Sequence, residues 1–288
     1  MKQRILLIDT SAVLHTVKFS LIKQKISPRE KSTFIIFGFL SKLQFLINKT
    51  RPNVLVFATD SKKSRRKKIY PSYKENRSQN NKTKEQITLD KLAFPQFEQV
   101  IDDVLPGLGF NNIFKANGLE ADDIIAKICK EHSNSEIIIV SRDGDLYQLL
   151  TPSVCMLYPK NNQYYTYRMF IKEYKIKPKA WGRVKCVAGC LSDSVGGVSG
   201  VGIVRAIQYL KGELPKNYKT YQNIINKEGK KIIKRNKRLV ILPFKGTPSF
   251  RIRQDNVSKN KIINIAEEYG FASILADLDS WAKSFGAY

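Results

Sequence analysis

Short apolar segments that alternate with longer helical patterns constrain the fold of this chain more than any other feature. Each is five or six residues long and almost entirely apolar, as expected for a strand buried on both faces of a sheet. We expect strands at residues 4–8, 53–58 and 136–140, a short one near 113–114 and a hairpin at 154–158 and 163–167. Helical patterns span 30–50, 85–105 (with Pro95 as a kink or break) and 119–132. The alternation predicts an α/β domain with a mainly parallel sheet.

The pattern changes after residue 167. Residues 168–288 are mainly helical, and a Gly-rich segment separates helical patterns at 178–191 and 201–211. We therefore predict an α/β domain over 1–167 and a helical region over 168–288. The four cysteines among 288 residues are too few and too unevenly spaced for a disulfide framework.

The charge of the chain points to a polyanionic partner. Fifty Lys and Arg against 25 Asp and Glu give a net charge of +25. Nucleic acid is favoured, because cations that neutralise phosphates release counterions. An anionic membrane surface is the alternative, but no basic amphipathic helix with an aromatic face supports it. There is no signal peptide and no apolar run of the roughly 18 residues needed to span a membrane, so we expect a cytoplasmic protein.

Acidic residues are scarce in so basic a chain, and many of them follow predicted strands or begin a predicted helix. They are Asp9, Asp60, Asp143 and Asp145 after strands, and Glu120, Asp122 and Asp123 before a helix. In open α/β sheets, ligands bind outside the carboxyl ends of the strands. Each acid alone could cap a turn or a helix N-terminus, but so many together indicate a shared site.

Converging carboxylates repel one another unless a cation joins them. Oxygen ligands without histidine favour Mg²⁺ or Mn²⁺ over zinc. His15 and His132 are far apart in the sequence, so a histidine base is not expected. Cys186 and Cys190 lie one helical turn apart, but two further zinc ligands are missing.

A strongly basic stretch, residues 61–84, follows directly from Asp60. It contains ten Lys and Arg, including Lys67 and Lys68, against one Glu, with Tyr70 and Tyr73 between them. A solvated loop is one interpretation. We favour a segment that grips a nucleic-acid strand, with cations for phosphates and rings for stacking on bases. A second basic run, 227–238, is either a solvated loop or a helix face.

The Gly-rich segment, residues 193–202, lies between two helical patterns. Glycines let a backbone approach a phosphate closely, and the N-terminus of the following helix adds positive charge. The segment is neither a Walker loop nor a dinucleotide fingerprint. A plain turn is the alternative.

Five motifs in order resemble the 5′-nuclease family of flap endonucleases and 5′→3′ exonucleases, and most closely its bacteriophage members of the ribonuclease H type. They are ILLIDTS, FATDSKKSRRKKIYPSYKENR, GLEADD, IIIVSRDGDLYQLL and GCLSDSVGGVSGVG, within residues 4–210. The resemblance implies a PIN-like domain, a helical arch (about 61–84) over the active site, and a helix–three-turn–helix motif (about 178–211) that holds duplex DNA.

The resemblance also implies roles for single residues. A first metal cluster would comprise Asp9, Asp60, Glu120, Asp122 and Asp123, and a second Asp143, Asp145 and Asp193, with two Mg²⁺ or Mn²⁺ ions in all and K⁺ at the helix–three-turn–helix. Lys74 and Arg77 would be catalytic, at the scissile phosphate. Contacts to DNA would come from Lys67, Lys68, Tyr73, Lys74, Arg77, Gly196, Gly197, Gly200 and Gly202.

The implied function is metal-dependent hydrolysis of phosphodiesters in DNA or RNA–DNA replication intermediates, for example in primer removal. The substrates would be 5′ flaps and nicked or gapped duplexes, cut by a monomer, with a single-strand DNA-binding protein as a partner. For a phage-encoded chain the location would be the host cytoplasm.

Cys190 departs from the family pattern, which has an acid three residues before the Asp193 position. A thiol is a poor ligand for Mg²⁺, so the second ion should bind more weakly. A non-catalytic, structure-specific DNA-binding protein is therefore an alternative, and a PIN-type ribonuclease acting on single-stranded RNA is another.

Overall fold

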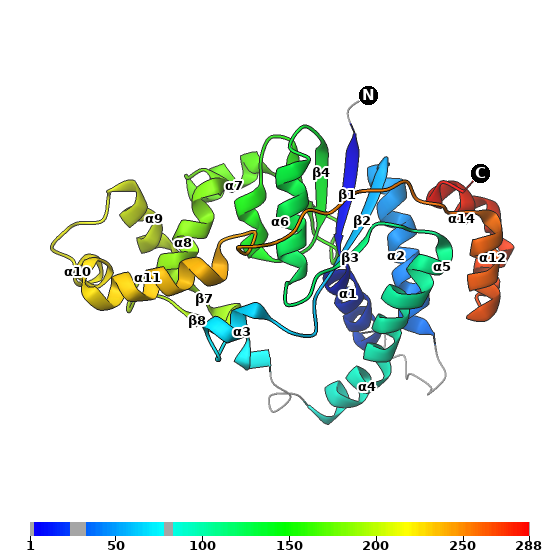
Figure 1. Cartoon of the computed structure of the whole chain (residues 1–288), viewed down its shortest axis with the longest axis horizontal. Helices are drawn as coiled ribbons and strands as arrows, with labels where there is room; N and C mark the ends of the chain where they lie inside the picture. Colours follow the sequence, from blue (N-terminus) through cyan, green and yellow to red (C-terminus); the bar gives the residue numbers. More distant parts are fainter. Residues whose placement is uncertain (1–2, 24–32, 78–82, 288) are drawn as a thin grey trace.

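A computed structural model describes residues 3–23, 33–77 and 83–287 (Figure 1). Its centre is a six-stranded sheet with strand order β3-β2-β1-β4-β5-β6, parallel except for β6. The strands are β1 Arg4–Asp9, β2 Val54–Thr59, β3 Ile113–Lys115, β4 Glu136–Val140, β5 Val154–Leu157 and β6 Tyr164–Tyr165. The structure confirms the predicted, mainly parallel α/β sheet.

Helices cover both faces of this sheet. Side chains alternate along β1, so that Leu6 and Ile8 enter one apolar core while Ile5 and Leu7 enter the other. The first core includes helices α1 Thr10–Lys23, α2 Phe34–Thr50, α4 Lys84–Gln99 and α5 Leu105–Leu108. The second includes α6 Ala121–Glu131, α7 Tyr167–Tyr174, α8 Trp181–Ala188 and α9 Ile203–Lys211. Sequence analysis did not predict α1.

Two predicted helices differ in the structure. The helix expected at 85–105 continues through Pro95 and becomes a π-helical turn at Val100–Val104. The helix expected at 178–191 ends at Ala188, because Gly189 takes a left-handed φ of 82°. Residues Gly189–Cys190 then form β7, which pairs with β8, Val195–Gly196, in a small antiparallel ribbon.

The helical region extends to opposite ends of the molecule. Helices α10 Lys219–Ile225 and α11 Lys227–Val240 lie with α9 at one end (Figure 1). After α11 the chain crosses to the other end, where α12 Lys259–Glu268, α13 Ala272–Ala276 and α14 Leu278–Phe285 follow. Trp281 and Phe285 of α14 share a core with Leu6 and Phe57. The predicted division at residue 167 did not include this packing of the C-terminal helices on the α/β domain.

None of the helices in the described part of the chain combines the length and apolarity needed to cross a bilayer.

Candidate active site

Five of the predicted acids line one pocket of about 650 Å³ at the carboxyl ends of β1, β2 and β4. They are Asp9, Asp60 and Asp143 beside the strand ends, and Glu120 and Asp122 at the start of α6. These acids lie far apart in the sequence, between positions 9 and 143, and the parallel sheet brings them together. The pocket is thus where an open α/β sheet is expected to bind its ligand.

Four of these carboxylates, Asp9, Asp60, Asp122 and Asp143, form what we call the first acidic group. Burial, and then the charge of Asp60, raise the pKa of Asp9 to about 7. Burial, Asp143 and Asp9 raise the pKa of Asp122 well above its usual value. Burial and Asp145 raise the pKa of Asp143. Mutual repulsion of this kind is relieved by a bound cation, and donors that are all oxygen fit a hard divalent ion.

Hydrogen bonds fix the orientation of Asp9 and Asp60 in the first acidic group. Asp9 accepts hydrogen bonds from the backbone N–H of Ala12 (3.0 Å) and from Ser141 Oγ (2.8 Å). Asp60 accepts one from the N–H of Ala121 at the start of α6 (2.9 Å). The carboxylates are therefore held at the rim of the pocket by groups that do not neutralise them.

Glu120 is electrostatically different from the first acidic group. Its Oε2 accepts hydrogen bonds from Lys74 Nζ and from the Tyr73 hydroxyl, both at 2.9 Å. Burial alone would raise the pKa of Glu120, but Lys74 and Arg66 hold it below its usual range. Glu120 is thus an ionised carboxylate whose charge is already balanced by protein cations.

Tyr73 does not present its ring to a ligand. The residue is only 2% exposed, and its ring packs in a small apolar cluster with Cys186, Cys190 and Val195. Its hydroxyl lies 3.0 Å from Asp193 Oδ2 as well as near Glu120. The expectation that this ring stacks on a base is wrong, because the ring completes the interior beneath the site.

Asp123 is not available as a metal ligand, contrary to expectation. Its carboxylate is fully buried and pairs with Arg66, with Nη1–Oδ2 and Nη2–Oδ1 distances of 2.6 and 2.7 Å. It also accepts hydrogen bonds from the N–H groups of Glu120 and Phe244. A carboxylate this deeply buried needs a counter-ion, and here Arg66 supplies it. The E-x-x-D spacing from Glu120 was a signal for this role, because it forms a capping box at α6.

The basic stretch is docked on the protein up to residue 77. Within it, Lys67 and Lys68 on α3 (Arg65–Ile69) are exposed, whereas Arg66 is buried. Lys74 has a φ of 57°, and its N–H donates to the carbonyl of Asp193 (2.8 Å). The side chain of Arg77 and residues 78–82 lie outside the described part of the chain, so the arch expected over 61–84 is described only on either side of them.

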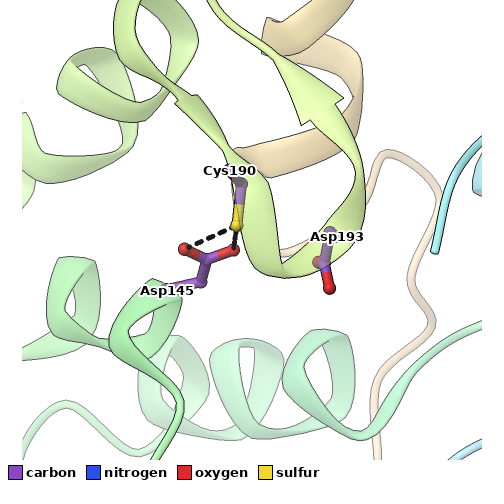
Figure 2. A group of neighbouring side chains, drawn as sticks. All are labelled: Asp145, Cys190 and Asp193. Atoms are coloured by element: carbon purple, nitrogen blue, oxygen red, sulfur yellow. Dashed lines mark hydrogen bonds between the residues drawn. The ribbon is translucent and has the colours of Figure 1, made fainter. Parts of the chain in front are cut away.

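A second group of ligand-type side chains lies beside the pocket. The ligand atoms of Asp145, Cys190 and Asp193 are within 4.8 Å of one another (Figure 2). The Cys190 thiol donates to Asp145 Oδ2 at 3.3 Å. Lys185 Nζ lies 3.0 Å from Asp145 Oδ1, and Lys74 Nζ lies 3.9 Å from Asp193 Oδ1. In the described residues no other trio of acidic, cysteine or histidine side chains is this close.

Sequence analysis missed Lys185, because no local signal distinguishes it among fifty Lys and Arg. It also assigned Asp143 to the same cluster as Asp145 and Asp193. The structure places Asp143 between the two groups: it lines the pocket with the first acidic group and lies electrostatically beside Asp145.

The glycines of the Gly-rich segment are not equivalent. A Cβ on Gly196 or Gly202 would meet no atom within 4 Å, so their backbones are open to a ligand. A Cβ on Gly197 would lie 2.2 Å from the Ala188 carbonyl oxygen, so this glycine is required by packing. Gly200 has a φ of 74°, and Gly202 precedes the first turn of α9. Of the two open positions, Gly202 stands at the N-terminus of α9, as the predicted phosphate site requires, whereas Gly196 lies in β8.

The family model of the 5′-3′ exonuclease N-terminal, resolvase-like domain matches residues 4–175. The chain belongs to the 5′-3′ exonuclease family. The match contains all residues of the first acidic group but ends before Lys185, Cys190 and Asp193.

Proteins with detectable sequence similarity carry related names. The 5′-3′ exonuclease of Aquifex aeolicus is 32% identical over 196 residues, which is 67% of this chain and 62% of that protein. A 5′-3′ exonuclease of Buchnera aphidicola is 28% identical over 96% of this chain and 88% of its own length. The thermostable DNA polymerase I of Thermus thermophilus is 28% identical over 73% of this chain, which spans only 24% of the polymerase.

Solved structures share the fold of this 5′-3′ exonuclease family member. T5 5′-exonuclease with divalent zinc ions bound aligns with a TM-score of 0.69 and 22% identity, over 98% of this chain and 97% of that one. Flap endonuclease-1 from Methanococcus jannaschii aligns with a TM-score of 0.62 and 16% identity, over 99% and 93%. The structural similarity thus includes the helical region, which lies mostly beyond the family model's match.

Proposed function

We propose that this protein is a divalent-metal-dependent, structure-specific 5′-nuclease that hydrolyses phosphodiesters in DNA or RNA–DNA replication intermediates, as in primer removal. The observation that supports it best is the meeting of acids from separate strand ends in one pocket, next to Lys74. Membership of the 5′-3′ exonuclease family and the names of the relatives agree with it. A single-strand DNA-binding protein as partner, a monomeric state and a cytoplasmic location stay predictions.

Mg²⁺ or Mn²⁺ is the cofactor that the first acidic group would hold. Asp9, Asp60, Asp122 and Asp143 offer oxygen donors only, and their repulsion leaves a favourable place for a hard cation. A divalent ion held there would supply an activated water for attack on the phosphodiester and would offset the charge of the transition state. The chain's own contribution is to fix Asp9 through Ser141 and Ala12, and Asp60 through Ala121.

Lys74 is the residue of the chain best placed to act on the scissile phosphate. Its side chain is 21% exposed and lines the pocket beside Glu120 and Asp122. Its left-handed backbone and its N–H bond to Asp193 hold the ammonium group at this rim. A fixed cation that needs no reorganisation stabilises the negative charge that develops on the phosphate. Arg77 is proposed for the same region on the family resemblance alone.

Duplex DNA would bind along the end of the molecule formed by α9 to α11. The second basic run forms helix α11, and its basic side chains at spacings of three and four residues share one exposed face. They are Lys227, Lys230, Lys231, Lys234, Lys237 and Arg238. A row of cations on one helix face suits a phosphate backbone without reading sequence. Gly196 and Gly202 would add backbone contacts nearby, and a K⁺ ion at this turn stays a prediction.

The deciding experiment is cleavage of a 5′-labelled flap duplex in Mg²⁺ with sizing of the products. Asp122→Asn should abolish cleavage while leaving DNA binding nearly unchanged, and Asp102→Asn, at an exposed acid outside the pocket, is the matched control. Short products indicate exonucleolytic action, and a released intact flap indicates endonucleolytic action. Full activity in Asp122→Asn would refute the assignment of the site.

Two other outcomes would replace the proposal. Tight flap binding without cleavage in Mg²⁺ and in Mn²⁺ would identify a non-catalytic DNA-binding protein, an alternative that Cys190 and Lys185 in the second group keep open. Preference for unstructured RNA over branched DNA would identify a ribonuclease. The open Gly-rich turn at the start of α9 argues against the latter, because it is suited to a duplex backbone.

A further inference from the structure

The second group, Asp145, Cys190 and Asp193, already contains its own cations. Two carboxylates face two ammonium groups, since Lys185 Nζ is 3.0 Å from Asp145 and Lys74 Nζ is 3.9 Å from Asp193. The third member is a thiol that donates a hydrogen bond to Asp145 (Figure 2). Asp145 is therefore paired with Lys185, and Asp193 shares Lys74 with Glu120, in contrast to the first acidic group, whose members repel one another.

The position of Lys185 is fixed by the helix that carries it. Trp181 lies one turn earlier on α8, and its ring centroid is 5.7 Å from Lys185 Nζ. The Trp181 indole N–H donates to the Gly144 carbonyl at 2.7 Å, which anchors α8 beside the residue that precedes Asp145. The lysine side chain is only 16% exposed. Its ammonium group is thus a built part of the site and not a surface charge that happens to lie nearby.

The donors that remain do not fit a hard divalent ion. Mg²⁺ and Mn²⁺ require oxygen ligands in a near-octahedral arrangement, and a thiol is a poor ligand for them. The Tyr73 hydroxyl lies 3.0 Å from Asp193 Oδ2 and shares its one proton between Asp193 and Glu120, and the Lys185 ammonium group is already bonded to Asp145 Oδ1. An incoming ion would have to displace a half-buried ammonium group or lie next to it, and like charges at such a distance repel strongly in a partly buried site.

We infer that the Lys185 ammonium group occupies the place of the second divalent ion, so that the substrate-free protein binds one Mg²⁺ or Mn²⁺ ion tightly and not two. The inference deepens the proposed function and rests on it, because the single ion would sit in the first acidic group. Lys185, which is always present, would then offset the negative charge at the second position in place of a divalent ion.

The test is a count of Mn²⁺ ions bound per chain, by electron paramagnetic resonance of free Mn²⁺ during titration of the full chain without DNA. We expect one tight ion for the wild type. The double variant Lys185→Met/Cys190→Asp removes the ammonium group and restores a carboxylate, so it should gain a second ion with at least about tenfold higher affinity at that position. Cys190→Ser, which stays neutral and keeps Lys185, is the matched control and should still bind one.

The possible counts separate the inference from the proposed function. Two tight ions in the wild type would overturn the inference and leave the proposed function intact. No tight ion would overturn both. A folded double variant that binds only one ion would also overturn the inference, because Lys185 and Cys190 would then not be what excludes the second. If circular dichroism shows that the double variant is unfolded, the wild-type count alone decides.

Discussion

Neighbouring acids at the start of α6 should respond in opposite ways to the same substitution. Asp123 is fully buried and makes a two-pronged ion pair with Arg66, which is itself 2% exposed and also donates from Nε to the Leu239 carbonyl. Asp122 faces the pocket, where burial, Asp143 and Asp9 raise its pKa. Asparagine removes one charge at either position with almost no change in volume, so the two variants differ only in what the charge does.

The magnitude for Asp123→Asn follows from the uncompensated guanidinium group. Removing one partner of a buried pair costs about 3–5 kcal/mol, because the other charge is left in a poorly solvated place. For a chain of this size that corresponds to a fall in the melting temperature of roughly 5–8 °C. Asp122→Asn relieves repulsion instead, so its stability should equal or exceed that of the wild type. Its effect should appear in cleavage alone.

Urea unfolding at pH 7 in the presence of EDTA measures both variants without a contribution from bound metal. A double-mutant cycle of Asp123→Asn with Arg66→Met then isolates the pair, and a coupling energy of several kcal/mol is expected. The argument fails if Asp123→Asn lies within about 1 kcal/mol of the wild type, or if Asp122→Asn is as destabilising as Asp123→Asn.

Two further predictions concern the Gly-rich turn and the pocket wall. Gly197→Ala should lower the free energy of unfolding by about 1–3 kcal/mol, because its Cβ would overlap the Ala188 carbonyl. Gly196→Ala should melt like the wild type and weaken flap binding, because nothing lies within 4 Å of the added Cβ. Equal melting temperatures for the two variants would contradict this. Burial and the charge of Lys18 lower the pKa of His15 to about 4 in the folded protein. Between pH 6.5 and about 4, His15 is therefore protonated in the unfolded chain but neutral in the folded one. Stability from this residue is therefore lost as pH falls from 6.5 to about 4, by about 2–3 kcal/mol, and His15→Phe should remove that loss in urea unfolding at pH 7 and pH 4.5. The same pH dependence in both proteins would refute the role of His15.

The sheet and the first acidic group could be predicted because their signals are local. Buried parallel strands are short apolar runs, and the position of Asp9 or Asp143 just after such a run is enough to place its carboxylate at one edge of the sheet. Helix α1 gave no such signal, because Val13, Leu14 and Val17 are buried but are separated by polar residues and a histidine. The early end of α8 depends on a backbone angle at Gly189 that composition does not reveal.

Side-chain roles within the site were less predictable, because they depend on which face of an element is covered. Asp122 and Asp123 are adjacent in sequence, and only the packing of Arg66 and of the segment after α11 decides that one faces the pocket and the other the interior. Tyr73 likewise looks like a surface ring in a basic stretch until β7 and β8 enclose it. Long-range contacts of this kind leave no periodic pattern in the sequence.

The origin of the charges explains how the site and the helical region depend on one another. The acids come from the strand ends and the start of α6, whereas their partners come from elements that dock against them. Lys185 comes from α8, Lys74 from the loop held by Asp193, and Arg66 is fixed between Asp123 and the Leu239 carbonyl of α11. Glu120, Asp123 and Asp145 thus each stabilise the docking of a segment on the α/β domain. In the first acidic group, Lys74 and Lys185 offset only part of the repulsion at Asp122 and Asp143, so the pKa of each stays raised. That remaining imbalance supports the proposal that a divalent ion binds there and not in the second group.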